Sequence, residues 1–324
     1  MRRALAVALA LVGCLALATP SPAGADAQAT GIRLSGNDRI ETAIAISQAA
    51  FAPSGSARAA VLARSDGFAD ALAGTPLAVN TFAPMLLTPP TGLDPRAETE
   101  LKRVLPAGQT VYLLGLQGAL SDAVAAQVKS DGYTVTRLGG NDRYETAVAV
   151  AKAVPAPMAI LLATGNNPGD ALPGGAAAAQ AKGVVLLTND ATMPAATQQY
   201  ISDHSSLPLY ALGAPAAAAA PSAMAIFGAD RYETSVKVAQ KFFTTPANLG
   251  FANGFAYPDA LAGGAAIGQA QGPLLLVAPD VLPDVVHQFV VSISPTVHVA
   301  EIYGGKAVIP DGVLAAIDSA IRGN

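Results

Sequence analysis

The motif Gly-Asn-Asp-Arg-Tyr-Glu-Thr-Ala, residues 140–147, occurs twice more in this chain in closely similar form. The first copy occupies residues 36–43 (Gly-Asn-Asp-Arg-Ile-Glu-Thr-Ala) and the third occupies residues 228–235 (Gly-Ala-Asp-Arg-Tyr-Glu-Thr-Ser). The aspartates of successive copies are 104 and 88 residues apart. This period is longer than that of solenoid repeats, and it predicts three copies of a small domain.

Composition supports globular domains and argues against a nucleic-acid partner. Apolar residues make up 52% and charged residues 13% of the 324 residues, a mixture typical of a packed α/β protein. The formal net charge is −4, and it becomes −6 if Arg2 and Arg3 are removed with a leader. Because an acidic chain offers no overall basic field, we expect no nucleic-acid binding.

The N-terminus has the pattern of a secretory signal peptide, which we assign to residues 1–25. Arg2 and Arg3 precede an apolar run over residues 4–18, and small residues follow Pro22. The run is short for a membrane span, and no later segment offers the roughly 18 uninterrupted apolar residues that a span needs. The pattern predicts secretion and no membrane span.

The chain has a single cysteine, Cys14, and it lies inside this leader. The mature protein is therefore expected to contain no disulfide. Residues 11–14 (Leu-Val-Gly-Cys) are also similar to a bacterial lipoprotein box, so lipid anchoring through Cys14 is an alternative.

Each repeated motif has the spacing of a helix capping box. An aspartate at the N-cap accepts from backbone amides, and a glutamate three residues later reaches back to the cap. We assign this structural role to Asp38, Glu41, Asp142, Glu145, Asp230 and Glu233.

Strands and helices alternate after each motif. Continuous apolar runs such as residues 59–63 and 159–163 are typical of strands buried on both faces, and amphipathic stretches separate them. The pattern predicts α/β modules with doubly wound, mainly parallel sheets. We place the modules at residues 31–136, 137–224 and 225–324. The second module has only residues 214–221 where the first has a full helix, which accounts for the shorter spacing.

Cofactor binding, metal binding and catalysis find no support in the motifs. The glycine pairs lack the GxGxxG turn, no GxxxxGK[ST] is present, and an aspartate stands where a phosphate would bind. His204, His287 and His298 all lie outside the repeated motifs, so no recurring triad or metal cluster can be built from them. We expect no cofactor, no metal and no enzymatic activity.

The arginines of the three motifs, Arg39, Arg143 and Arg231, are placed in a helix first turn, where a cation opposes the helix dipole. Each is therefore expected to have an anionic partner. One interpretation is an ion pair with the aspartate of the next motif in the same repeat, Asp70, Asp170 or Asp259. The other is contact with an anionic ligand at the carboxyl edge of the sheet.

Four motifs recur in order: Gly-x-Asp-Arg-(Tyr/Ile)-Glu-Thr, Asp-Ala-Leu-x-Gly, Pro-x-Leu-Leu and a Tyr-x-x-Gly strand end. Together they resemble the type 2 cell wall-binding repeat of secreted Gram-positive surface proteins, over nearly the whole mature chain. The resemblance implies three Rossmann-like modules packed as an intramolecular pseudo-trimer that attaches noncovalently to an anionic secondary wall polymer. We expect the protein to be monomeric. In that family the repeats usually accompany a separate effector domain.

The resemblance also implies that the family's Ile-Leu-Leu segments take part in polymer attachment. The corresponding residues are Met85, Leu86, Leu87, Val185, Leu186, Leu187, Leu274, Leu275 and Leu276. The residues alone describe buried strands, and the two roles are compatible if the strands shape a groove between modules. This chain departs from the pattern at Thr75, where the other repeats have glycine, and at Pro173, which is expected to interrupt a helix.

These observations predict a secreted, cell wall-associated protein that binds an anionic wall polymer and has no catalytic activity. The alternative is an accessory protein that modifies a separate cell wall hydrolase (autolysin).

Overall fold

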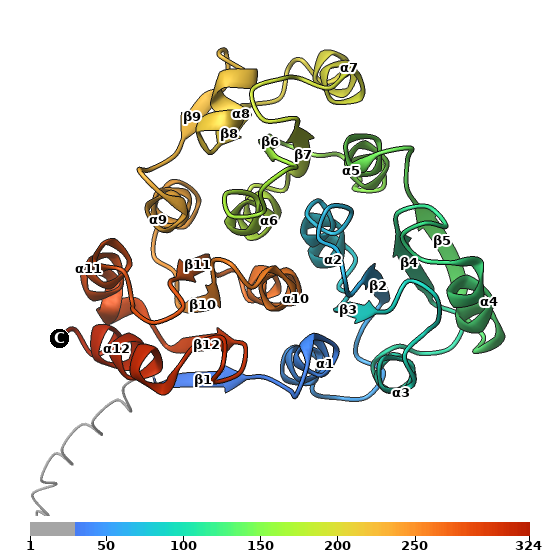
Figure 1. The fold of residues 1–324 in the computed structure, drawn as a ribbon, viewed down its shortest axis with the longest axis horizontal. Coiled ribbons are helices and arrows are strands. Elements are labelled where there is room, and N and C mark those ends of the chain that lie inside the picture. Colours follow the sequence, from blue (N-terminus) through green and yellow to red (C-terminus); the bar gives the residue numbers. More distant parts are fainter. Residues whose placement is uncertain (1–29) are drawn as a thin grey trace, which may run out of the picture.

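The computed structural model describes residues 30–324, so the signal peptide and Cys14 lie outside the described part. It contains three α/β modules set around a common centre (Figure 1). Module 1 comprises α1 (Arg39–Ala50), β2 (Ala59–Arg64), α2 (Gly74–Asn80), β3 (Met85–Thr88), α3 (Pro95–Val104), β4 (Thr110–Leu114), α4 (Asp122–Ser130) and β5 (Thr134–Leu138). Module 2 comprises α5 (Arg143–Lys152), β6 (Ile160–Thr164), α6 (Ala171–Gln180), β7 (Val184–Thr188), α7 (Ala195–Asp203), β8 (Leu209–Leu212), α8 (Ala214–Ala219) and β9 (Met224–Ile226). Module 3 comprises α9 (Arg231–Phe242), β10 (Asn248–Asn253), α10 (Tyr257–Gln269), β11 (Leu274–Val277), α11 (Asp284–Ile293), β12 (Val299–Tyr303), α12 (Asp311–Ile321) and the N-terminal strand β1 (Gly31–Leu34).

Each sheet has four parallel strands in equivalent order: β3-β2-β4-β5, β7-β6-β8-β9 and β11-β10-β12-β1. The doubly wound α/β prediction is confirmed. The strand that leads into each repeated motif completes the sheet of the preceding module. For the first motif that strand is β1, which pairs with β12 so that Leu34 lies opposite Tyr303. The N-terminal strand thereby closes the three modules into a ring.

The central helices α2, α6 and α10 meet at the middle of the ring (Figure 1). Small residues allow this close approach. A Cβ atom added at Gly175 would lie 2.7 Å from the Cβ of Thr75, and one added at Gly264 would lie 3.6 Å from the Thr75 hydroxyl. Thr75, which departs from the glycine of the other repeats, is buried at this centre. One threonine faces two glycines there.

Pro173 does not interrupt α6, contrary to the expectation from the sequence. The helix begins at Ala171, so Pro173 is its third residue, and α6 continues to Gln180. A backbone N–H in the first turn has no partner inside the helix, and proline sacrifices no helical hydrogen bond there.

Module 2 has the short final helix that the sequence predicts, and a second change accompanies it. In module 1, Arg137 on the last strand donates to a loop carbonyl and pairs with Asp122 at the start of α4. In module 3, Arg33 does the same with Asp311 at the start of α12. The strand pairing places Ala225 at the equivalent position of β9. Module 2 therefore lacks the arginine, its aspartate partner and the long helix.

Over residues 30–324, no helix is long and apolar enough to cross a membrane.

Candidate functional site at the module junctions

The capping boxes form as predicted and fix the start of α1, α5 and α9. The Asp142 carboxylate accepts from the amides of Tyr144 (2.9 Å) and Glu145 (2.8 Å), and Glu145 accepts from the Asn141 amide (2.8 Å). The other two motifs make the same bonds. The helix N-terminus is therefore already occupied by the protein's own carboxylate. An anionic ligand cannot use these amides.

The threonines of the first and third motifs link their motifs to the preceding module in the ring. Thr42 accepts from the Gly36 amide at 3.1 Å, and its hydroxyl also faces the Asp259 carboxylate. Thr234 accepts from the Gly228 amide at 3.1 Å and faces Asp170 in the same way. These aspartates thus approach the motif of the next module, not the motif of their own repeat.

The three arginines make no close ion pair, which corrects the pairing expected from the sequence. Arg39 donates to the Ser65 carbonyl at 2.7 Å, Arg231 donates to the Gly254 carbonyl at 2.6 Å, and Arg143 donates to the Gly165 carbonyl. Each carbonyl follows the first strand of the arginine's own module. Within residues 30–324, no carboxylate oxygen lies within 4.0 Å of any of the three guanidinium groups. Their charge remains available to a ligand.

Two of the junctions contain open crevices beside these arginines. The crevice between modules 3 and 1, the 3/1 crevice, has a volume of about 290 Å³. It is lined by the first motif, including Asp38, Arg39 and Thr42, and by Phe255, Tyr257, Asp259 and Gly305. The crevice between modules 2 and 3, the 2/3 crevice, has a volume of about 260 Å³. It is lined by the third motif, including Asp230, Arg231 and Thr234, and by Asn167, Asp170 and Pro215.

Asp259 lies at the base of the 3/1 crevice and is 7% exposed. Burial raises its pKa to about 6, although the charge of Arg39 and the Thr42 hydroxyl oppose this shift. Burial also raises the pKa of Asp170 at the base of the 2/3 crevice, against the lowering effects of Thr234 and Arg231. The crevices therefore become more positive as the pH falls, because these carboxylates are neutralised.

The raised pKa of Asp259 predicts a pH-dependent stability. A proton binds Asp259 more tightly in the folded than in the unfolded chain, so this group favours folding below pH 4 and loses that effect as the pH rises through about 6. Asp259→Asn should flatten the dependence between pH 4 and pH 7, a change of up to about 3 kcal/mol. Urea unfolding at pH 4.5 and 7.5 measures this effect. The exposed Asp203→Asn is the control, and a wild-type slope in Asp259→Asn would contradict the prediction.

The nine residues of the Ile-Leu-Leu segments do not line the crevices; each is at most 2% exposed. They form the edge strands β3, β7 and β11, which are covered by α1, α5 and α9. Met85, for example, shares a small internal cavity with Ile46 of α1 and with Ala262 and Ala266 of α10. Seven of the nine side chains belong to the apolar cluster that extends across the three modules, whereas Leu86 and Leu275 pack within the cores of modules 1 and 3.

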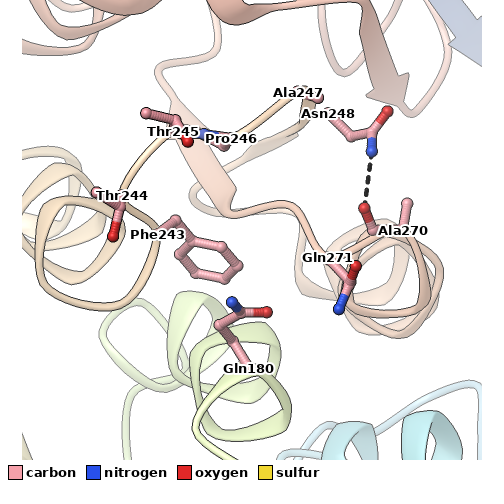
Figure 2. Close-up of a pocket in the computed structure, with 9 residues that line it drawn as sticks. All are labelled: Gln180, Phe243, Thr244, Thr245, Pro246, Ala247, Asn248, Ala270 and Gln271. Atoms are coloured by element: carbon pink, nitrogen blue, oxygen red, sulfur yellow. Dashed lines mark hydrogen bonds between the residues drawn. The ribbon is translucent and has the colours of Figure 1, made fainter.

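Another crevice, of about 320 Å³, lies at the opposite, amino edge of the strands (Figure 2). Figure 2 shows it between the ends of α6, α9 and α10, with the amides of Gln180 and Gln271 and the ring of Phe243 on its walls. None of its lining residues is charged, so it does not suit an anion.

The structure does not bring the three histidines together. The His204 ring stacks on Tyr200, and His287 contacts the carbonyl of Asn324. Among residues 30–324, no group of three or more His, Cys, Asp or Glu side chains is placed to hold a metal ion.

Sequence reasoning missed the aromatic wall of the 3/1 crevice. Phe255 and Tyr257 lie just before the Asp-Ala-Leu motif of repeat 3; at the Tyr257 position repeat 1 also has an aromatic residue, Phe68, whereas repeat 2 has Pro168. Differences between repeats at that fixed distance from the motif were the available signal.

The ring of three modules and its arginine-bearing junctions define a tandem-repeat binding protein. A family model, cell wall binding domain 2 (CWB2), matches residues 33–125, 137–220 and 225–314, and the chain belongs to this family. The three repeats are therefore cell wall-binding domains.

The relatives agree with this assignment. The chain is 30% identical over 250 residues to N-acetylmuramoyl-L-alanine amidase LytC of Bacillus subtilis, covering 75% of this chain and 49% of the relative. It is 26% identical over 253 residues to the amidase enhancer of the same organism, covering 78% and 35%. The chain thus spans half or less of these relatives.

Two solved structures from Clostridium difficile share the fold at 23% identity. Cwp8 superposes with a TM-score of 0.80, covering 90% of this chain and 52% of Cwp8. Cwp6 superposes with a TM-score of 0.81, covering 96% and 51%.

Proposed function

We propose that this protein attaches noncovalently to an anionic secondary polymer of the Gram-positive cell wall, by means of the arginines at its module junctions, and catalyses no reaction itself. The observation that carries the proposal is the state of Arg39, Arg143 and Arg231. Each is held by a backbone carbonyl and has no close carboxylate among residues 30–324. Because the helix amides are occupied by the capping aspartates, the guanidinium groups are the cationic donors that remain for an anion at these junctions.

The net charge of the chain does not prevent this interaction. The acidic side chains of the first motif are partly offset by a nearby cation, since Arg96 of α3 pairs with Asp38 at 2.9 Å and with Glu41 at 2.8 Å, as well as with Asp94. The potential that a ligand meets in a crevice depends on such nearby charges more than on the total.

The experiment removes the three charges while keeping the hydrogen-bonding side chains. Arg39→Gln, Arg143→Gln and Arg231→Gln together should weaken co-sedimentation with purified walls by at least about 100-fold, since one charged hydrogen bond contributes about 1.5–3 kcal/mol. Each single change should weaken it about tenfold if the junctions act independently. Thermal unfolding of the variants separates a loss of contact from a loss of fold.

Two controls complete this test. Arg58→Gln removes an exposed arginine at the start of β2, on the opposite edge of the sheet, and should leave binding unchanged. The wild-type protein should not co-sediment with walls from which the anionic polymer has been stripped. Equal binding to stripped and intact walls would contradict the hypothesis that the protein binds an anionic polymer.

A role beside a separate hydrolase is the second candidate. The two curated relatives are an amidase and an amidase enhancer, and both extend well beyond the region shared with this chain. Co-purification of a hydrolase with this protein from intact walls, together with a change in the rate of wall digestion, would favour this candidate.

A further inference from the structure

The 3/1 and 2/3 crevices are built from equivalent positions but differ in one wall. Counting back from Asp259 and from Asp170 aligns Phe255 with Asn166 and Tyr257 with Pro168. Both aromatic residues line the 3/1 crevice, whereas the lining of the 2/3 crevice contains no aromatic side chain. The two crevices therefore share an arginine and differ in an aromatic wall that only the 3/1 crevice offers to a ligand.

The Phe255 ring is exposed yet held in place. It is 62% exposed, and the guanidinium carbon of Arg231 lies 4.1 Å from the ring centroid. Arg231 is itself fixed by its bond to the Gly254 carbonyl, and the Phe255 amide donates to the Asn253 side chain at 2.8 Å. A ring supported in this way loses little conformational freedom when its free surface is covered by a ligand.

Tyr257 extends this aromatic wall and is supported by the neighbouring module. Its ring packs edge-on against Phe68, with 5.2 Å between centroids. The rest of the lining brings the Arg39 guanidinium, the Asp259 carboxylate and the exposed Asn37 together with small apolar residues such as Pro258 and Val308. An apolar platform facing donors and acceptors suits a ligand with an apolar face and a hydroxylated rim, which is the character of a pyranose ring.

We propose that the 3/1 crevice is a sugar-recognition subsite, in which a pyranose ring bearing an anionic substituent stacks on Phe255 and Tyr257 while Arg39 binds the anion. The 2/3 crevice, with Arg231 and no aromatic lining, contacts an anionic group alone. This inference rests on the proposed function. It adds which chemical unit of the polymer is recognised and which module junction binds it.

The natural sequence contains no tryptophan, which permits a direct test. Phe255→Trp keeps the aromatic platform and introduces one fluorophore into the crevice. Titration with N-acetylglucosamine 6-phosphate should give a saturable change in tryptophan emission, and Arg39→Gln in the same chain should weaken it about tenfold. Inorganic phosphate and neutral N-acetylglucosamine, which each lack one half of the ligand, should both bind at least about tenfold more weakly than the sugar phosphate. No response to the sugar phosphate, or equal responses to all three probes, would overturn the subsite.

Wall binding by the full chain separates this inference from the proposed function. Phe255→Ala should lower wall affinity about 3- to 10-fold, the usual effect of losing one aromatic contact. Phe82→Ala, which removes another exposed aromatic ring at the amino edge of the sheets, should have no effect. If Phe255→Ala binds like wild type while the triple arginine variant does not, the sugar subsite is wrong and the proposed function stands. If the triple arginine variant also binds like wild type, both are wrong.

Discussion

Gly175→Thr should destabilise the ring by about 3 kcal/mol or more, and Thr75→Gly in the same chain should restore most of that loss. The two positions face each other where α2, α6 and α10 meet, and a Cβ at Gly175 would lie 2.7 Å from the Thr75 Cβ. Two branched side chains cannot share that space. Moving the threonine from α2 to α6 keeps one threonine and two glycines at the centre.

Urea unfolding of the wild type, both single variants and the double variant measures the coupling. Thr75→Gly alone should also be destabilising, because it leaves a cavity and places a glycine in a helix. Gly264→Ala is the matched control, since its Cβ would have ordinary contacts with Thr75 and alanine favours the helix by about 1 kcal/mol. Additive effects of the two single changes would show that the three central helices do not pack as described.

Arg103→Ala should destabilise module 1 by about 3–5 kcal/mol, because it leaves a buried carboxylate without its cation. Glu100 is 2% exposed and receives two hydrogen bonds of 2.7 Å from the Arg103 guanidinium and one of 2.6 Å from the Ser47 hydroxyl. Arg103 also donates to the Phe51 carbonyl at the end of α1. Its loss therefore affects both the packing of α1 on α3 and the end of α1.

The exposed Lys306 provides the control for this prediction. It pairs with Asp311 at 2.8 Å, and the two side chains are 73% and 59% exposed. Pairs of this kind contribute at most about 1 kcal/mol, so Lys306→Ala should have a small effect on the urea midpoint. Similar losses in the two variants would mean that burial of Glu100 does not matter to stability.

Local chemistry made much of the fold predictable. The Asp-x-x-Glu spacing identified the start of α1, α5 and α9, because a capping box needs only four consecutive residues. The apolar runs identified the buried strands, and the short final segment of module 2 was visible as residues bounded by proline. The nine residues of the Ile-Leu-Leu segments were likewise recognisable as strands, although their exposure to a ligand could not be judged.

Contacts between modules were not predictable from local patterns. Asp259 faces Thr42 of another module, and sequence proximity had suggested Asp–Arg pairs within a single repeat. The ring brings together residues that are far apart in the chain. The periodic patterns within each repeat do not predict which modules are neighbours in space. The aromatic wall of the 3/1 crevice was missed for the same reason, because Phe255 and Arg39 come from different modules and line one crevice only in the folded ring.

The pairing of β1 with β12 also has a consequence for the order of folding. During synthesis β1 is made before every other strand of the described region, yet its partner β12 is among the last to appear. The sheets of modules 1 and 2 can be completed as the chain grows. The sheet of module 3 can be completed only when β1, which was synthesised first, pairs with β12. Such long-range pairing is intrinsically slow. Closing the ring is therefore expected to be the late step of folding, and loss of either end of the described chain would damage the same sheet.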